Sequence, residues 1–506
     1  MSLEPRKPRR GLEKVRSRGC KARDNRSSAP SRSGVADRDV VLMTRSKATR
    51  HEEGRSRPEG TPGQEAKVRT QSRVALPPNL TRVNEAAQRS QRTRFTALLH
   101  HIDLPALSRS FFRQKRQAGA GVDGVTVADY ERDLQDCLRD LHTRIHRGSY
   151  RPHPVRRSYI PKPDGGSRPI GIPALEDKIV QGAVAELLST IYEVDFRNFS
   201  YGFRPGRNPH QALDALHTGL MTQRVNWVLD ADIRSFFDSV DHGMLLRMLD
   251  RRIGDPRIIE LIKRWLKAGV MENGQRSDTV EGTPQGAGIS PLLANVFLHY
   301  ALDLWVSDWR RTKAAGRVIF VRYADDFVLG FQRKQDALRF QAELRDRLRK
   351  VGLRLNEDKT RLLSFGAYAK TPQNKLGRKR PETFDFLGFT HYCSTSRNGR
   401  HVVKRKTQRK RLHKKLKALR AQLKARRHRP VIEQWRWLCS VLKGHYNYYG
   451  LPNNIHSLQV FRHQVLKAWI KWLRRRSQKN RRNWKQFYSF LDSCFPLPQP
   501  RITHPR

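Results

Sequence analysis

The sequence predicts an α+β fold followed by a helical bundle, and three observations lead to this prediction. Short apolar strands alternate with amphipathic helices between about residues 80 and 395, as in a domain of mixed sheet and helix. Beyond residue 400, leucines and aromatic residues recur at helical spacing in a very basic stretch. The segment before about residue 75 is rich in Arg, Ser, Gly and Pro and poor in aromatic residues, which is typical of a disordered arm.

These changes in composition divide the 506 residues into four segments. A basic, disordered arm covers residues 1–75, the α+β part covers residues 76–395, and the helical part covers residues 396–480. Residues 481–506 form a short tail, which we interpret as a candidate remnant of a DNA-binding segment.

The chain is strongly basic, with 101 Lys and Arg against 47 Asp and Glu and a formal net charge of +54. Such an excess is typical of nucleic-acid-binding proteins, because the neutralisation of phosphates releases counterions and stabilises the complex. An anionic membrane surface is the weaker alternative. No run of 18 or more apolar residues occurs, and we therefore expect no transmembrane helix.

The five cysteines stand singly and form no Cys-x-x-Cys pair, which argues against a zinc ribbon or a disulfide framework. The basic N-terminal stretch has no apolar core, so it does not have the pattern of a secretory signal. Both observations favour a reducing cytosol as the setting of the protein.

The first elements of the α+β part are two strands, a helix and a buried strand. "RRSYIPKPDGGSRPIGIP" predicts two short strands on either side of a turn at Pro163-Asp164-Gly165. "ALEDKIVQGAVAELLSTIYEV" predicts an apolar helix over residues 174–194. "VNWVLDADI" predicts a buried strand over residues 225–233, which leads into "RSFFDSVDH".

The stretch "VIFVRYADDFVLGF", residues 318–331, has two adjacent acids between apolar flanks. It predicts a β-hairpin with Asp325 and Asp326 near its tip. An amphipathic helix follows, and Gly352 stands where the C-cap of this helix is expected. The predicted apolar face of the helix consists of Ala337, Phe340, Leu344, Leu348 and Val351.

Three helices with basic outer faces are predicted beyond residue 400, and Ser457 is a candidate N-cap of the third. The charge density favours RNA binding over a merely solvated surface. The aromatic residues offer stacking surfaces, although most aromatics at helical spacing belong to a core. The apolar seams are Leu412, Leu416, Leu419 and Leu423, then Trp435, Leu438, Leu442, Tyr446 and Tyr449, then Leu458, Phe461, Val465, Ala468 and Trp472.

The acids of the α+β part form a candidate metal site. "DADIRSFFDSVDH" contains Asp230, Asp232, Asp238 and Asp241, and Asp232 follows an apolar strand as Asp325 does. A strand end and a hairpin tip can lie side by side in one sheet, where their carboxylates could share a pair of Mg²⁺ ions that serve phosphoryl transfer. The alternative is local hydrogen bonding, for which Asp is common at hairpin turns.

Several motifs in this chain resemble, in the same order, those of the group II intron-encoded reverse transcriptases and maturases. The resemblance runs from about residue 80 to the C-terminus. It implies the fingers and palm of a right-hand polymerase over residues 76–395, with an antiparallel palm sheet, and a helical thumb or maturase domain over residues 396–480. The motifs are "YIPKPDGGSRPIGIP", "YGFRPGRNPHQAL", "DADIRSFFDSVDH", "GTPQGAGISPLLANVFLH", "RYADD", "GLRLNEDKT", "FDFLGF" and "LKGHYNYYG".

The resemblance implies a role for individual residues of the polymerase site. Asp232 and Asp325 would be catalytic ligands of two Mg²⁺ ions, with Asp326 supporting the second. Phe237 would exclude the ribose 2′-OH of the incoming deoxynucleoside triphosphate, and Lys359 would protonate the pyrophosphate or else be a surface lysine. The other implied nucleotide-binding residues are Lys162 and Arg168 at the triphosphate and Gln285 and Gly286 in the templating pocket.

The implied partners are group II intron RNA, target DNA and a primer, without a membrane or an obligatory protein partner. We expect the helical part to bind RNA, and the protein to lie in the bacterial cytoplasm, at the nucleoid with its intron RNA; an organelle is an open alternative that nothing in the sequence indicates. The family's longer members carry a C-terminal His-Asn-His endonuclease with paired cysteines, which we do not expect here. The candidate RNA-binding residues are Lys404, Arg405, Lys406, Arg409, Lys410, Arg411, Lys414, Lys415, Tyr446 and Tyr448.

The leading interpretation is therefore an RNA-directed DNA polymerase that binds intron RNA, assists its splicing and copies it into DNA for retromobility. A reverse transcriptase outside introns, for example one associated with CRISPR, is the first alternative. A maturase that only binds RNA is the second, and the intact Asp232, Asp325 and Asp326 argue against it. An RNA-directed RNA polymerase is disfavoured by Phe237.

Overall fold

A computed structural model describes most of the compact unit that extends from Thr70 to Arg506. The basic arm, the turn at Pro163-Asp164-Gly165, Lys162 and Gln285 lie outside the described residues. The described residues are 77–161, 166–272, 274–277, 282, 286, 288–367, 382–476 and 483–504.

A four-stranded antiparallel sheet in the order β6-β7-β3-β8 forms the palm. The buried strand and the hairpin predicted from the sequence are its three neighbouring strands β3, β6 and β7, which confirms both predictions. The strands are β3 (Trp227–Asp232), β6 (Val318–Tyr323), β7 (Asp326–Phe331) and β8 (Arg361–Ser364).

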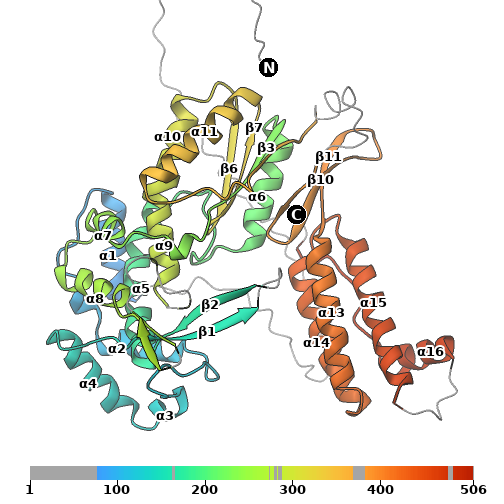
Figure 1. Cartoon of the computed structure of the whole chain (residues 1–506), viewed down its shortest axis with the longest axis horizontal. Coiled ribbons are helices and arrows are strands. Elements are labelled where there is room, and N and C mark those ends of the chain that lie inside the picture. The colour runs from blue at the N-terminus through green and yellow to red at the C-terminus, as the bar shows by residue number, and fades with distance from the viewer. Residues whose placement is uncertain are drawn as a thin grey trace, which may run out of the picture. The chain divides into compact units, whose positions relative to one another are not determined.

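The side chains of the palm strands alternate between two apolar cores. Leu229 and Phe327 belong to the main core, together with α5, α9, α10 and α11. Val228 and Val328 belong to a second core with α6 and the next sheet. In Figure 1 the palm strands accordingly stand between α10 and α11 on one side and α6 on the other. These helices are α5 (Leu175–Asp195), α6 (Pro209–Thr222), α9 (Ser290–Leu298), α10 (Leu304–Thr312) and α11 (Lys334–Lys350).

The helix α11 follows the palm hairpin and ends as the sequence predicts. Its buried residues include Ala337, Phe340, Leu344 and Leu348. Gly352 has a φ of +75°, and the N–H groups of Gly352 and Leu353 donate to the carbonyls of Arg349 and Leu348. This is the hydrogen-bond pattern of a Schellman motif, which favours glycine because its left-handed residue carries no Cβ.

A second four-stranded sheet, in the order β2-β1-β4-β5, belongs to the fingers. The two strands predicted around residue 164 pair antiparallel, with Arg156 opposite Ile172 and Pro161 opposite Ser167. The strands are β1 (Val155–Pro161), β2 (Ser167–Ile172), β4 (Val270–Glu272) and β5 (Gln275–Ser277). The helices of this part are α1 (Pro78–Arg89), α2 (Leu104–Phe112), α3 (Val127–Glu131), α4 (Leu134–His146), α7 (His242–Asp250) and α8 (Pro256–Leu266).

A three-stranded sheet in the order β11-β10-β9 leads from the palm into the helical part. Its strands are β9 (Phe384–Phe386), β10 (Phe389–Thr395) and β11 (His401–Thr407). Because β10 and β11 pair along their whole length, the predicted boundary at residue 395 falls at the turn of one continuous hairpin.

The helical part contains the three predicted helices, and a fourth helix, which was not predicted, lies in the tail and packs against them. The predicted leucine and aromatic seams form its core, together with Phe487 and Leu491 of the fourth helix. Ser457 is not the N-cap of α15: the helix begins at Ile455 after Asn454, so the prediction was wrong by one turn. The helices are α13 (Arg409–Ala425), α14 (Val431–Tyr449), α15 (Ile455–Arg474) and α16 (Trp484–Cys494).

The segment after α16 packs along α14. The carbonyl of Pro496 accepts a hydrogen bond from Trp435 Nε1, and the N–H of Thr503 donates to the carbonyl of Gly450. A Cβ on Gly450 would lie 2.4 Å from Thr503 Oγ1. The end of the predicted DNA-binding remnant is thus engaged with the bundle by hydrogen bonds and close contacts.

Candidate active site and nucleic-acid interface

The three predicted catalytic acids meet at one end of the palm sheet. Asp232, the last residue of β3, pairs with Asp326, the first residue of β7. Asp325 directly precedes Asp326 in the two-residue turn between β6 and β7, in which Ala324 has a φ of +58°. The strand pairing therefore brings together acids that are almost a hundred residues apart in the sequence.

A fourth acid, Asp230, lies on the same face of the palm sheet as Asp232, because side chains two positions apart on a strand point to the same side. Asp230 and Asp232 occupy the same side of β3 as Val228, and Val228 packs against the core that contains α6. Asp230 forms an ion pair of 3.2 Å with Arg361 of β8. No role is predicted for Asp230 from the sequence, although the Asp-x-Asp spacing on a strand is the signal that indicates its place beside Asp232. The other two acids of the motif lie apart: Asp238 is exposed, and Asp241 caps α7.

The crowding of carboxylates changes their protonation. Burial, followed by the charges of Asp230, Asp325 and Asp232, raises the pKa of Asp326 to about 7. Burial also raises the pKa of Asp230 to about 6, against the opposing effect of Arg361. A cluster of this kind favours a proton or a cation, because either one relieves the repulsion between desolvated negative charges.

Asp232 is held by neighbours from the loop that precedes β8. Its Oδ2 atom accepts hydrogen bonds from Asn356 Nδ2 at 3.0 Å and from Lys359 Nζ at 2.9 Å. The backbone N–H of Asn356 donates to the carbonyl of Asp232 as well. Lys359 therefore lies beside the acids, as the resemblance implies, although 69% of its side chain remains exposed.

The arrangement suits a divalent cation chemically, although the side chains do not converge on a point. No three His, Cys, Asp or Glu side chains of the described residues form a ready-made metal site. Asp232 is instead paired with Lys359, a cation that occupies one of its oxygens. Carboxylate oxygens are the ligands that Mg²⁺ prefers, and a cation would stabilise the ionised form of Asp326, whose pKa is raised first by burial and then by the neighbouring acids.

Two of the predicted nucleotide-binding residues can be placed by their contacts. Phe237 lies in the 3₁₀ helix η2 (Phe236–Asp238), half-buried against the main core, five positions after Asp232. Gly286 has a φ of +118°, and a Cβ there would lie 2.5 Å from the carbonyl oxygen of Gly171 in β2. Glycine thus permits a close backbone approach at this position, but the neighbour is the fingers sheet.

The remaining nucleotide-binding candidates are less well placed. Arg168 lies on β2 opposite Ile160 of β1, and its contact with the triphosphate stays a prediction. Lys162 and Gln285 lie outside the described residues.

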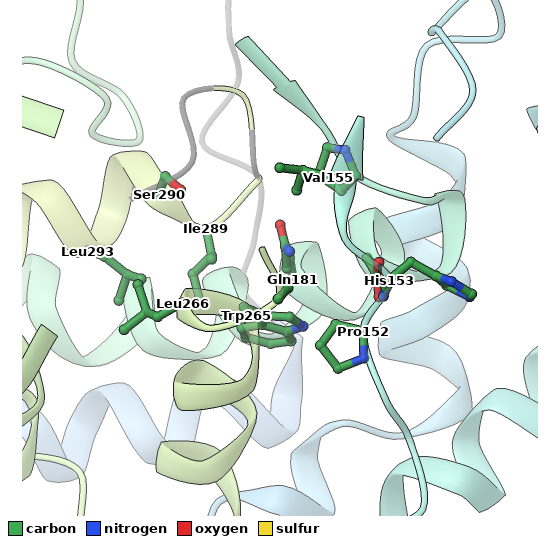
Figure 2. Close-up of a pocket in the computed structure, with 12 residues that line it drawn as sticks. Pro152, His153, Val155, Gln181, Trp265, Leu266, Ile289, Ser290 and Leu293 are labelled. Carbon is green, nitrogen blue, oxygen red and sulfur yellow. Dashed lines mark hydrogen bonds between the residues drawn. The ribbon is translucent and has the colours of Figure 1, made fainter. Parts of the chain in front are cut away.

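A small pocket lies between the fingers sheet and the start of α9. Figure 2 shows Gln181 of α5 within it, with Val155, Trp265 and Ile289 around it. The Oε1 atom of Gln181 accepts a hydrogen bond of 2.9 Å from the backbone N–H of Gly288. Gln181 therefore anchors the predicted templating motif to α5, a role that the sequence analysis missed.

Two predicted RNA-binding residues, Arg405 and Tyr446, face the interior, and we correct these two predictions. Arg405 is 1% exposed and forms an ion pair of 2.9 Å with Asp214 of α6, because the alternation along β11 points it inward. Tyr446 is buried in the bundle, so both side chains stabilise the protein rather than a contact with RNA. Tyr448 is half-buried and donates a hydrogen bond to the carbonyl of Leu387, and its contact with RNA stays a prediction.

The other basic candidates differ in their surroundings. Four of them are exposed on β11 and α13: Lys406, Arg409, Lys410 and Lys414. Lys404 is half-buried on β11. Lys415 is half-buried with its Nζ 3.2 Å from His445 Nδ1, and burial lowers its pKa. Arg411 is exposed, and its charge opposes the rise in the pKa of Asp326; its contact with RNA stays a prediction.

No helix in the described part of the chain has the length and apolar character needed to cross a membrane.

Comparisons with known proteins match this site. A family model described as "Reverse transcriptase (RNA-dependent DNA polymerase)" matches residues 160–391. Protein YkfC of Escherichia coli (strain K12) is 38% identical over 274 residues, which cover 48% of this chain and 71% of YkfC. Group II intron-encoded protein LtrA of Lactococcus lactis subsp. cremoris is 35% identical over 229 residues, which cover 45% of this chain and 38% of LtrA.

A third relative, the putative COX1/OXI3 intron 1 protein of Saccharomyces cerevisiae, is 26% identical over 329 residues. The match covers 56% of this chain and 38% of that protein, so the two intron-encoded relatives are matched over less than half of their length. The matched residues include β3, β6 and β7 with all three acids. The chain belongs to the reverse transcriptases, RNA-directed DNA polymerases, and among them to the group II intron-encoded reverse transcriptases and maturases.

Proposed function

We propose that this protein copies RNA into DNA at the site formed by Asp232, Asp325 and Asp326. The observation that carries the proposal is the register of the palm sheet, in which Asp232 and Asp326 are directly paired with Asp325 on the adjoining turn. The reaction joins a primer 3′-oxygen to the α-phosphorus of a deoxynucleoside triphosphate and releases pyrophosphate. Two Mg²⁺ ions held by these carboxylates would stabilise the charge that develops on the attacking and leaving oxygens.

The chain's own residues would bind and orient the substrates around these acids. Lys162 and Arg168 would contact the triphosphate, where Arg can donate two parallel hydrogen bonds to phosphate oxygens. Phe237 would contact the sugar at C2′ and exclude a hydroxyl group. Gln285 and Gly286 would line the templating pocket.

We further propose that the exposed basic residues of β11 and α13 bind group II intron RNA. A helix-and-hairpin surface with Lys406, Arg409, Lys410 and Lys414 exposed offers many positive charges to a phosphate backbone. Binding there would serve both the folding of the intron for splicing and its copying for retromobility. Target DNA and a primer would enter at the same palm.

Primer extension on an RNA template tests the polymerase. We expect Asp325→Ala to abolish DNA synthesis and to leave RNA binding within the range of the unaltered protein. The matched control is Asp346→Ala, which removes an exposed carboxylate of α11 and should leave synthesis intact. DNA synthesis by Asp325→Ala at the rate of this control would refute the assignment.

A second experiment separates intron binding from general RNA binding. Affinity for a group II intron RNA is compared with affinity for an unrelated structured RNA of the same length, at one salt concentration. Equal affinities would contradict the intron as the specific partner and would favour a reverse transcriptase that acts outside introns.

A further inference from the structure

We propose that a buried clamp holds the catalytic turn in place, and that Arg322, Asp303, Asn295 and Gly202 are positioning residues for the reaction. This inference rests on the proposed function. Arg322 lies three residues before Asp325, and its side chain is 0% exposed. Burying a guanidinium destabilises a protein unless the group is paired with an opposite charge and fully hydrogen-bonded. The partners of Arg322 therefore indicate its role.

Arg322 connects a helix to the turn that carries the acids. Its Nε and Nη2 atoms donate to the two carboxylate oxygens of Asp303, at 2.8 and 2.5 Å. Its Nη1 atom donates to the carbonyl of Ala324, within the turn, at 2.9 Å, and to Asn295 Oδ1 at 3.1 Å. The guanidinium is planar and forked, so one rigid group fixes the turn relative to two points of the main core.

The partners of Arg322 come from an unusual stretch of helix. Asp303 is the last residue of η3 (His299–Asp303), a π-helical turn between α9 and α10, and it is 0% exposed. A π-helical turn contains an extra residue and changes the direction of the side chains that follow it. We infer that this turn brings Asp303, at its own end, and Asn295 of α9 to the same guanidinium.

The other side of the turn is backed by the segment that leads into α6. The N–H of Tyr201 donates to the carbonyl of Arg322, and the N–H of Arg322 donates to the carbonyl of Phe199. A Cβ on Gly202 would lie 2.3 Å from the backbone nitrogen of Ala324. Asn295 Nδ2 donates to the carbonyl of Gly202 at 2.7 Å. Asn295 thereby links the Arg322 side of the turn to the Gly202 side by hydrogen bonds.

This geometry predicts a defect in the chemical step rather than in binding. A loosened clamp lets Asp325 and Asp326 shift relative to Asp232, while the fingers and the RNA-binding surface keep their contacts. A misplacement of about 1 Å at reacting groups costs about 100-fold in rate. We expect Asp303→Asn to lower kcat by about that factor and to leave KM for the deoxynucleotide within about twofold.

The chain offers a matched control, because Arg252 and Asp195 form a second buried ion pair at 2.9 Å. Arg252 donates hydrogen bonds to the carbonyls of Ser90 and Thr93, so its contacts lie in the fingers and not at the catalytic turn. Asp195→Asn removes the same charge from the same kind of pair. It should lower the melting temperature as Asp303→Asn does and leave kcat within about threefold.

A third variant keeps the ion pair intact. Gly202→Ala presses a methyl group onto the turn and should lower kcat as well, even if Asp303→Asn fails to fold. Hydrogen exchange reports on the turn independently of activity. The amides of residues 199–203 and 322–326 should exchange faster in Asp303→Asn and Gly202→Ala than in the unaltered protein. In Asp195→Asn their exchange rates should be unchanged.

The outcomes separate the two proposals. An unaltered protein that makes no DNA on a primed RNA template would refute the proposed function. The clamp is refuted if the unaltered protein is active but the clamp variants that fold, Gly202→Ala among them, have the same kcat as Asp195→Asn. A rise in KM with unchanged kcat would also overturn it, because that pattern belongs to a binding defect.

Discussion

Lys359 Nζ lies 2.9 Å from Asp232 Oδ2, so a lysine occupies an oxygen of the carboxylate that is proposed to bind metal. The pair is largely exposed on the lysine side, and exposed ion pairs are worth about 0.2–1 kcal/mol. A magnesium ion bound there would therefore compete with Lys359 for Asp232, but Lys359 would be only a weak competitor.

We predict two separable effects for Lys359→Gln in primer extension. The Mg²⁺ concentration for half-maximal activity should fall by about 1.5- to 5-fold, because a competing cation is removed. If Lys359 also protonates the pyrophosphate, the rate at saturating Mg²⁺ should fall by about 100-fold or more. Lys350→Gln, which alters an exposed lysine at the end of α11, is the control. Unchanged magnesium dependence and unchanged rate would assign Lys359 to the surface.

The raised pKa of Asp326 predicts how the stability of the metal-free protein depends on pH. The folded state keeps the Asp326 proton up to about pH 7, whereas the unfolded chain releases it near pH ~4. The protonated carboxyl therefore contributes stability that is fully present below about pH 4 and is lost as the pH rises through about 7. The loss amounts to at most about 1.4 kcal/mol per pH unit.

Urea unfolding in EDTA at several pH values measures this effect. The free energy of unfolding should fall more steeply between about pH 5 and 7 in the unaltered protein than in Asp326→Asn, which cannot ionise. Asp346→Asn should keep the steep dependence. Parallel curves for the unaltered protein and Asp326→Asn would show that Asp326 ionises in the ordinary range.

Phe237 is predicted to select deoxynucleotides by steric exclusion. Phe237→Ala should raise kcat/KM for ribonucleotides relative to deoxynucleotides by about 100-fold or more, because the site then accepts a 2′-hydroxyl. Single-nucleotide extension with each triphosphate measures this ratio. Phe112→Ala, at an exposed position of the fingers, should leave the ratio unchanged. A ratio in Phe237→Ala equal to that of the control would make Phe237 a core residue only.

The exposed basic residues of β11 and α13 are predicted to contact RNA phosphates. Replacing Lys406, Arg409, Lys410 and Lys414 by Gln should weaken RNA binding and reduce the slope of log K against log salt by about 0.7–0.9 for each lost contact. Filter binding between low and physiological salt gives the slope. Arg405→Met is the contrast: its side chain is buried, so the melting temperature should fall while the slope persists. An unchanged slope in the fourfold variant would place the RNA elsewhere.

Much of the fold was predictable because its signals are local. The apolar flanks of Asp325 and Asp326, the helical face of α11 and the glycine at its C-terminus all belong to short continuous stretches. Such patterns depend on propensity and on which side of an element is buried. Ser457 was wrongly predicted because a serine near the start of an apolar helical pattern can stand either at the N-cap or inside the first turn. The local sequence does not distinguish these two positions.

The candidate site was predictable in its residues but not in its contacts. Asp232 and Asp325 could be paired from their motifs, whereas the inward orientation of Arg405 depends on which face of β11 meets α6. The residues that support the site, Gln181 and Arg322, act through partners far away in the sequence. No spacing in the chain encodes these partners.

The sequence by itself determined the chemical inventory of this protein: two acidic strand ends, a basic helical region and the succession of motifs that places it among the reverse transcriptases. Only the tertiary structure decided that Asp232 pairs with Asp326, that Lys359 forms an ion pair with Asp232, and that Arg322 donates a hydrogen bond to the turn from the buried side. The physical reason is the range of the interactions. Propensity and periodicity act over neighbouring residues, whereas sheet register and buried hydrogen bonds are settled by the packing of the whole core.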